Sequence, residues 1–113
     1  MQAMRASFYR LLITFLFVPA SADAEIRIAA FNVAMGFDRP GEMAEALESG
    51  QHERLAGVAG ILQEIRPDIV LLSEFDYDPG IDAAGLLNEN YLTVRRGGHE
   101  PIEYPYHFRA PVN

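Results

Sequence analysis

Alternation of apolar and polar positions predicts a strand at residues 25–32. Alternate positions share one face: Ile26, Ile28, Ala30 and Asn32. The other face is polar at Arg27 and becomes apolar at Ala29 and Phe31. A strand that is apolar on both faces is typical of a sheet interior. We therefore expect this strand to enter a core and to be buried on both faces.

A helix is predicted over residues 51–65. Its apolar positions recur at spacings of three and four and form one stripe: Leu55, Val58, Ala59, Leu62 and Ile65. Gly57 and Gly60 each lower helix propensity by about 1 kcal/mol relative to Ala, so we expect close packing on a sheet to offset this. Pro67 ends the helix, because the residue before a proline is disfavoured in the helical region.

A second strand follows at once, with the apolar run Ile69–Leu72 leading into Ser73 and Glu74. An unpaired carboxylate is very costly to bury, so Glu74 marks the point at which this buried strand leaves the core. Strand, helix and strand form a βαβ unit with a right-handed crossover. If the strands are parallel, Asn32 and Glu74 lie at the same edge of the sheet, where open α/β sheets bind ligands.

Weaker patterns lie within this unit, between its first strand and its helix, and after it. Residues 33–50 are expected to form a loop with a short helical turn at residues 42–48. Asp82 is placed to cap a short helix over residues 83–89, and Asn90 is placed to end it. These segments connect the elements of the unit without changing the predicted α/β class.

The C-terminal part of the chain has strand composition in two places. Residues 91–95 are rich in residues that favour strands. Residues 102–108 are aromatic but lie among Pro101 and Pro105, which restricts them to an edge strand or an extended loop. The sequence contains no internal repeat and no low-complexity segment.

The N-terminal pattern is typical of a secretory signal peptide. Arg5 and Arg10 precede an apolar run at residues 11–18, and a small-x-small cleavage signal follows at residues 22–24. The apolar run is far shorter than the roughly 20 residues that a membrane-spanning helix needs, so we expect no stable membrane anchor. The protein is expected to be exported to the periplasm or beyond.

Cleavage after Ala24 would divide the chain into a signal peptide, residues 1–24, and a single domain, residues 25–113. The domain has seven Arg against fifteen acidic residues, a net charge of −8. Such a surface repels nucleic-acid phosphates unless cations intervene, so non-specific DNA binding is not expected. The chain has no Cys, which excludes disulfides and thiolate metal sites.

Asn32 and Glu74 are the leading candidates for chemistry. An amide oxygen and a carboxylate are hard donors that suit Mg²⁺ or Mn²⁺ rather than Zn²⁺. Such an ion acts as a Lewis acid on a phosphoryl oxygen. The residues alone leave two alternatives open, a turn-forming Asn and a solvated Glu.

Two segments carry a resemblance to a known family. Residues 28–33 (IAAFNV) followed by residues 66–74 (RPDIVLLSE) resemble the opening of the endonuclease/exonuclease/phosphatase superfamily, which has the DNase I-like fold. Residues 100–106 are similar to secreted bacterial members. The chain has Ser73 before Glu74, where the family more often has Gln. The resemblance implies the N-terminal portion of a four-layer α/β/β/α sandwich, truncated here.

By this resemblance, Asn32 matches an active-site Asn that orients the metal or phosphate, and Glu74 matches the Mg²⁺ ligand. The implied function is an exported Mg²⁺- or Mn²⁺-dependent phosphoesterase acting on a phosphate ester. The family's Asp-x-Asn pair and late Asp-His are absent from this sequence, so we expect no turnover from these 113 residues alone. The alternative is a small secreted non-catalytic α/β module that binds a partner.

The remaining candidates have simpler interpretations. We expect His52 on the surface, His99 in solvent and His107 in a packing or edge position, and we assign the catalytic base to none of them. Arg39 and Arg54 are expected to be surface cations. Asp76 and Asp78 are expected to form a loop and could also support a metal at Glu74. The aromatic residues Tyr104, Tyr106 and Phe108 are expected to pack and could also stack on a substrate.

Overall fold

The computed structural model describes residues 23–75 and 78–110. The predicted signal peptide therefore lies outside the described residues except for Asp23 and Ala24, which are exposed and belong to no helix or strand. The elements follow in the order β1 (Ile28–Met35), α1 (Glu42–Ser49), α2 (Glu53–Ile65), β2 (Ile69–Phe75), α3 (Ala83–Leu87) and the π-helical turn η1 (Asn88–Leu92). The protein belongs to the α/β class.

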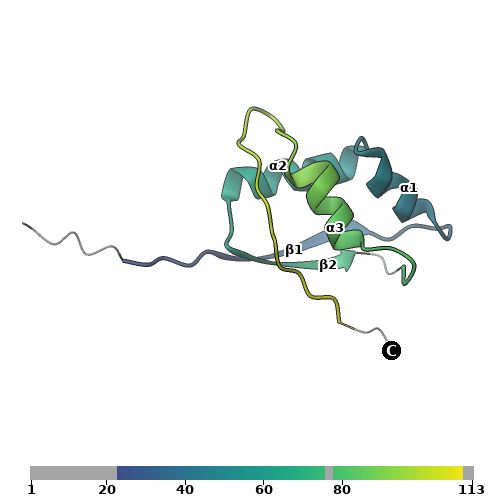
Figure 1. Ribbon diagram of the computed structural model, residues 1–113, viewed down its shortest axis with the longest axis horizontal. Coiled ribbons are helices and arrows are strands. Elements are labelled where there is room, and N and C mark those ends of the chain that lie inside the picture. Colours follow the sequence, from purple (N-terminus) through teal and green to yellow (C-terminus); the bar gives the residue numbers. More distant parts are fainter. Residues whose placement is uncertain (1–22, 76–77, 111–113) are drawn as a thin grey trace, which may run out of the picture.

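The described elements form two layers. β1 and β2 pair in parallel as a two-stranded sheet, and the helices lie together on one side of it (Figure 1). The predicted parallel pairing is confirmed. None of the described helices is long and apolar enough to cross a membrane.

Cross-strand pairs alternate between the two faces of the sheet. Ala29 pairs with Val70, and Phe31 with Leu72, on the side where the partly buried residues pack against the core. The other side, here called the outer face, carries the cross-strand pairs Ile28–Ile69, Ala30–Leu71 and Asn32–Ser73. The β-strand period of two separates the two sets.

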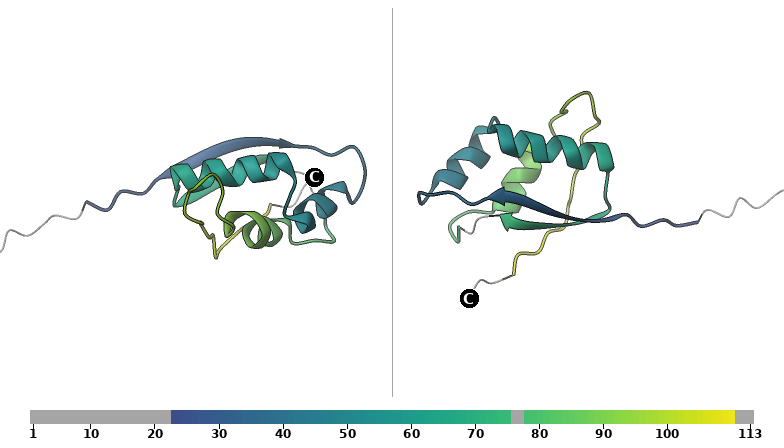
Figure 2. Two further views of the ribbon diagram at one scale, coloured as in Figure 1. Left: turned by 90° about the horizontal axis from the view of Figure 1, so that it is seen from above. Right: turned by 180° about the vertical axis from the view of Figure 1, so that it is seen from behind.

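The prediction that the strands are buried on both faces is wrong for the outer face. Ile28 is 70% exposed, and Leu71 is 65% exposed. The physical reason is that the described helices all cover one side of the sheet, while no described helix or strand covers the other side (Figure 2). A continuous apolar run indicates that both faces of a strand can be buried, but it does not indicate which part of the protein covers each face.

The helix α2 was predicted well. Its buried positions include four of the five stripe residues: Leu55, Val58, Ala59 and Leu62. The fifth, Ile65, is 45% exposed because it lies in the last turn. Gly57 and Gly60 do not lie close to the sheet: a Cβ on Gly57 would meet nothing, and one on Gly60 would approach only Arg96.

The C-terminal helical segment differs from its predicted structure. Asp82 caps α3 as expected, since its carboxylate accepts a hydrogen bond from the Gly85 N–H at 3.1 Å. Asn90 does not end the helical segment, because the chain continues through η1. The strand predicted at residues 91–95 is also wrong, because Tyr91 and Leu92 belong to η1 and are buried.

Buried Gln63 attaches the chain after η1 to α2. Its amide nitrogen donates to the Leu92 and Val94 carbonyls at 2.8 and 2.7 Å, and its amide oxygen accepts from the Arg96 N–H at 2.9 Å. The tail then runs extended without forming a strand between residues 101 and 110, and the Tyr104 hydroxyl donates to the Pro67 carbonyl. Residues 104–110 end on the outer side of the sheet (Figures 1 and 2).

Candidate metal site and adjacent pocket

Asn32 and Glu74 lie at the same edge of the sheet. Asn32 pairs with Ser73, the residue immediately before Glu74, across the parallel strands. Because both strands run in the same direction, their carboxyl ends meet at this edge, and both side chains are exposed there. The structure therefore brings together the two residues that the sequence placed 42 positions apart.

The strand ends are irregular at these residues. Between the pairs Asn32–Ser73 and Met35–Phe75, β1 contains one residue more than β2, which makes a bulge. Ala34 and Glu74 both have positive φ, at 48° and 52°. A non-glycine residue pays on the order of 1–2 kcal/mol for this conformation.

The bulge determines where Glu74 lies. Regular alternation would place Glu74 on the helix side, because Leu72 lies there. With the left-handed conformation at Glu74, both Ser73 and Glu74 are exposed, and Phe75 packs against the core. The strained backbone thus delivers the carboxylate to solvent at the sheet edge, an arrangement that recurs at functional sites.

The donor atoms suit a hard cation. The Asn32 side-chain oxygen accepts a hydrogen bond from the Ala34 N–H at 2.9 Å, which orients the amide and leaves a second lone pair. Two such oxygens form part of a Mg²⁺ shell, in which waters and a substrate phosphate complete the coordination. In the part of the chain that the structure describes, no three His, Cys, Asp or Glu residues group as a metal site.

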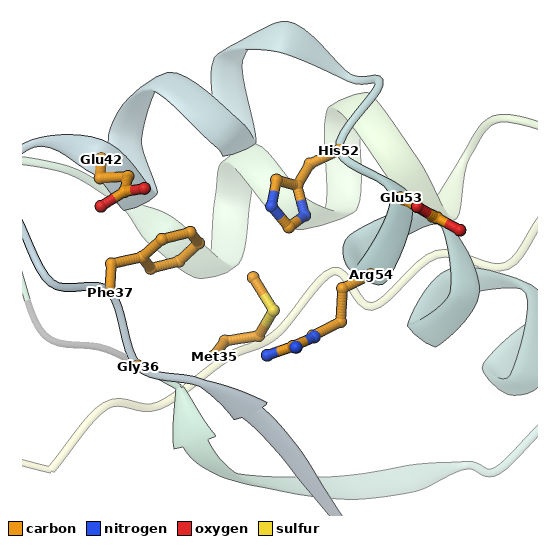
Figure 3. A pocket seen from close by; sticks show the side chains of 7 residues that line it. All are labelled: Met35, Gly36, Phe37, Glu42, His52, Glu53 and Arg54. Atoms are coloured by element: carbon orange, nitrogen blue, oxygen red, sulfur yellow. The ribbon is translucent and has the colours of Figure 1, made fainter.

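A pocket of about 580 Å³ opens beyond the end of β1. Its walls come from the β1 exit and from the first residues of α1 and α2: Met35, Gly36, Phe37, Glu42, His52, Glu53 and Arg54. Phe37, Met35 and His52 point toward one another in its interior (Figure 3). The pocket lies at the carboxyl end of β1, as Asn32 does.

His52 is half-buried in this pocket, so the expectation of a surface histidine is wrong. Its ring meets the edge of Phe37 with centroids 5.7 Å apart. Its Nδ1 is buried and has no hydrogen-bond partner among the described residues. The sequence held no signal for this position, because the burial depends on how α1 packs beside the start of α2.

The two candidate arginines contact their own surroundings. Arg54 donates to the Ala34 carbonyl and so links the start of α2 to the bulge. Arg39 is exposed and precedes α1, and its guanidinium lies 3.7 Å from the carboxylate of half-buried Glu42, the first residue of α1. Both are exposed, as expected of surface cations, and Arg54 also lines the pocket.

The other candidate histidines and acids lie apart from the pocket lining. His99 is partly buried, and the exposed His107 has its Nε2 3.1 Å from the Asp82 carboxylate rather than a packing contact. Asp78 is a loop former, as predicted, because its side chain accepts from the Gly80 N–H at 2.8 Å. Asp76 lies outside the described residues.

The three tail aromatics separate into two kinds. Tyr104 packs against the core and bonds to the Pro67 carbonyl, as expected of a packing residue. Burial raises the pKa of Tyr104 above its usual value of 10.0, against the opposing charge of Arg66. Tyr106 and Phe108 are 91% and 88% exposed, so the packing expectation is wrong for them.

Comparisons with known proteins were made by sequence and by structure. No protein family, no curated protein and no solved structure matches this chain. Its function is therefore argued from the site itself.

Proposed function

We propose that the edge formed by Asn32 and Glu74 is the metal site of an exported phosphoesterase. The observation that carries this proposal is the parallel register, which pairs Asn32 with Ser73, the residue before Glu74. The resemblance of these strands to the endonuclease/exonuclease/phosphatase superfamily supports it. The two described layers would then be the N-terminal portion of a DNase I-like four-layer sandwich.

Each residue has a separate role in this proposal. Glu74 supplies the anionic ligand, and its exposed position leaves room for waters and a phosphate ester beside it. Asn32 supplies a neutral oxygen whose orientation is fixed by the Ala34 N–H. When bound, Mg²⁺ or Mn²⁺ stabilises negative charge on a phosphoryl oxygen. Arg54, which lines the neighbouring pocket, supplies a cation for a phosphate.

The proposal is tested by metal binding rather than by turnover, because the family's Asp-x-Asn and Asp-His sequences are absent from the chain. Mn²⁺ binding is measured by electron paramagnetic resonance, with competition by Mg²⁺. We expect a Kd on the order of 1 mM, as for sites with few protein ligands and several waters. Glu74→Gln should weaken binding at least tenfold, and Asn32→Ala should weaken it less.

A matched control is Glu89→Gln, which removes the same charge from an exposed position in η1. Diffuse attraction of cations to an acidic chain would make the two variants alike. Equal Mn²⁺ affinity in Glu74→Gln and Glu89→Gln would therefore refute a site at the sheet edge. Circular dichroism of each variant shows whether the fold is retained.

A second candidate function is that of a non-catalytic binding module. The specific observation in its favour is the exposure of Tyr106 and Phe108 in the tail. Exposed aromatic side chains are typical anchors of binding surfaces. If Mn²⁺ binding does not depend on Glu74, this second function becomes the better one.

A further inference from the structure

The outer face of the sheet is an apolar surface. Its large side chains are Ile28, Ile69 and Leu71, which are 70%, 55% and 65% exposed, and Ile26, which is 67% exposed, lies in the chain just before β1. Ala30 pairs with Leu71 in the register and is exposed as well. Single exposed apolar residues are ordinary, but a contiguous patch of this kind marks an interaction surface.

The outer face carries no charge along most of its length. The cross-strand pairs Ile28–Ile69 and Ala30–Leu71 are apolar, and the pair Asn32–Ser73 that follows is polar and neutral. The carboxylate of Glu74 stands at the carboxyl end. The exported domain has a net charge of −8, so two copies repel each other at long range. Contact through the outer face adds little local repulsion to this, because its cross-strand pairs are uncharged.

The tail enlarges the apolar area on this side. Residues 104–110, which include Tyr106 and Phe108, pass to the outer side of the sheet (Figures 1 and 2). At their exposed fractions, these two aromatics and the four large aliphatic residues present on the order of 900 Å². One partner in a stable protein interface contributes about 800 Å². The available area therefore meets the requirement of a dimer.

We propose that the outer face binds a second copy of this chain. In the sandwich proposed above, a second sheet covers this same face, and in a dimer of the 113-residue chain the sheet of the second copy takes that place. Two such sheets would pack face to face, about 10 Å apart, with the apolar pairs of each opposite those of the other. The contact uses the same patch on both partners, so it closes at two copies and does not extend into a filament. Each outer-face residue occurs twice in the interface, which doubles the effect of any substitution there.

The test is the mass of the chain in solution. The protein is purified from the periplasm of an expression host, its covalent mass is recorded, and sedimentation velocity is run from 1 to 200 µM in EDTA. The chelator makes the result independent of the proposed metal site. We expect reversible dimers that tighten as salt rises, because salt screens like-charge repulsion and strengthens apolar burial.

Leu71→Lys should weaken the dimer at least tenfold, although it lowers the net negative charge. The matched control is Ile61→Lys, which changes an apolar residue that is 42% exposed on α2, away from the outer face. Ile28→Thr combined with Leu71→Thr is a second disruptive variant that keeps or raises β propensity.

Four results would overturn the proposal: a native chain that stays monomeric at 200 µM, masses that grow beyond the dimer, a dimer unchanged in both outer-face variants, or an equal loss in Ile61→Lys. Circular dichroism of every variant identifies any loss of fold. If Leu71→Lys does not fold, the threonine variant decides.

Discussion

The hydroxyl of Tyr91 joins three parts of the helix layer, and its removal should cost measurable stability. Tyr91 is fully buried, although the sequence pattern placed it in a strand. Its hydroxyl donates to the Ala46 carbonyl in α1 and accepts from the His52 N–H at 3.0 Å, just before α2. The Ser49 hydroxyl lies 3.4 Å away. Tyr91→Phe deletes this oxygen and leaves the ring in place.

The expected loss follows from the groups that are left behind. The His52 N–H loses its partner, and a buried group without a partner costs about 1–3 kcal/mol. The Ala46 carbonyl loses one bond but still accepts from the Ser49 hydroxyl at 2.8 Å, so we expect a total loss of about 2 kcal/mol. The stacking of Arg96 over the ring, at 5.3 Å from its centroid, does not depend on the hydroxyl and should remain.

The assay is urea unfolding followed by circular dichroism. With a slope of about 1–2 kcal/mol per molar urea, the midpoint should fall by about 1–2 M while the slope stays constant. Tyr106→Phe is the matched control, because Tyr106 is 91% exposed and the same oxygen is removed. Its effect should stay within about 0.5 kcal/mol. Equal losses in the two variants would refute the role given to the Tyr91 hydroxyl.

The remaining predictions concern the attachment of the tail. Gln63→Leu removes the amide that bonds to three backbone groups, and urea unfolding should show a loss of about 2–3 kcal/mol in stability. The control Gln51→Leu changes an exposed residue and should cost less than about 0.5 kcal/mol. Similar losses in the two variants would contradict the role given to the Gln63 amide. Because burial raises the pKa of Tyr104, the folded chain holds the phenol proton more tightly than the unfolded chain. The contribution of this group to stability should be complete below pH 10 and lost as pH rises through the raised pKa. Thermal unfolding of Tyr104→Phe should not show this loss of stability at alkaline pH. If the variant and the native chain have the same pH profile of stability, the buried phenol is not the cause of the loss.

Sequence patterns predicted the elements whose causes are local. Pro67 and the apolar stripe determine where α2 ends and which side it buries, and the observed helix agrees. The carboxylate at the end of an apolar run located the end of β2, and the parallel register then followed from a helix between two strands. For the same reason, the sequence predicted that Asn32 and Glu74 share an edge.

The errors have tertiary causes. Residues 91–95 favour a strand locally, but buried bonds from Tyr91 to α1 and to the start of α2 hold the chain in η1. Likewise, no local pattern reports the bulge at Ala34 or the positive φ at Glu74, because both follow from the pairing of β1 with β2. The pocket around His52 depends on two helix starts meeting.

The unequal support of the two layers has a consequence for local opening. The buried side chains of Tyr91 and Gln63 connect the parts of the helix layer. The sheet, in contrast, has two strands, an exposed outer face and a bulge with positive φ at its carboxyl end. Amide hydrogen exchange should therefore be faster at the carboxyl ends of β1 and β2 than in α2. An ion held by both Asn32 and Glu74 would join these strand ends and slow that exchange. Metal binding at the proposed site would then also stabilise the pairing of the two strands.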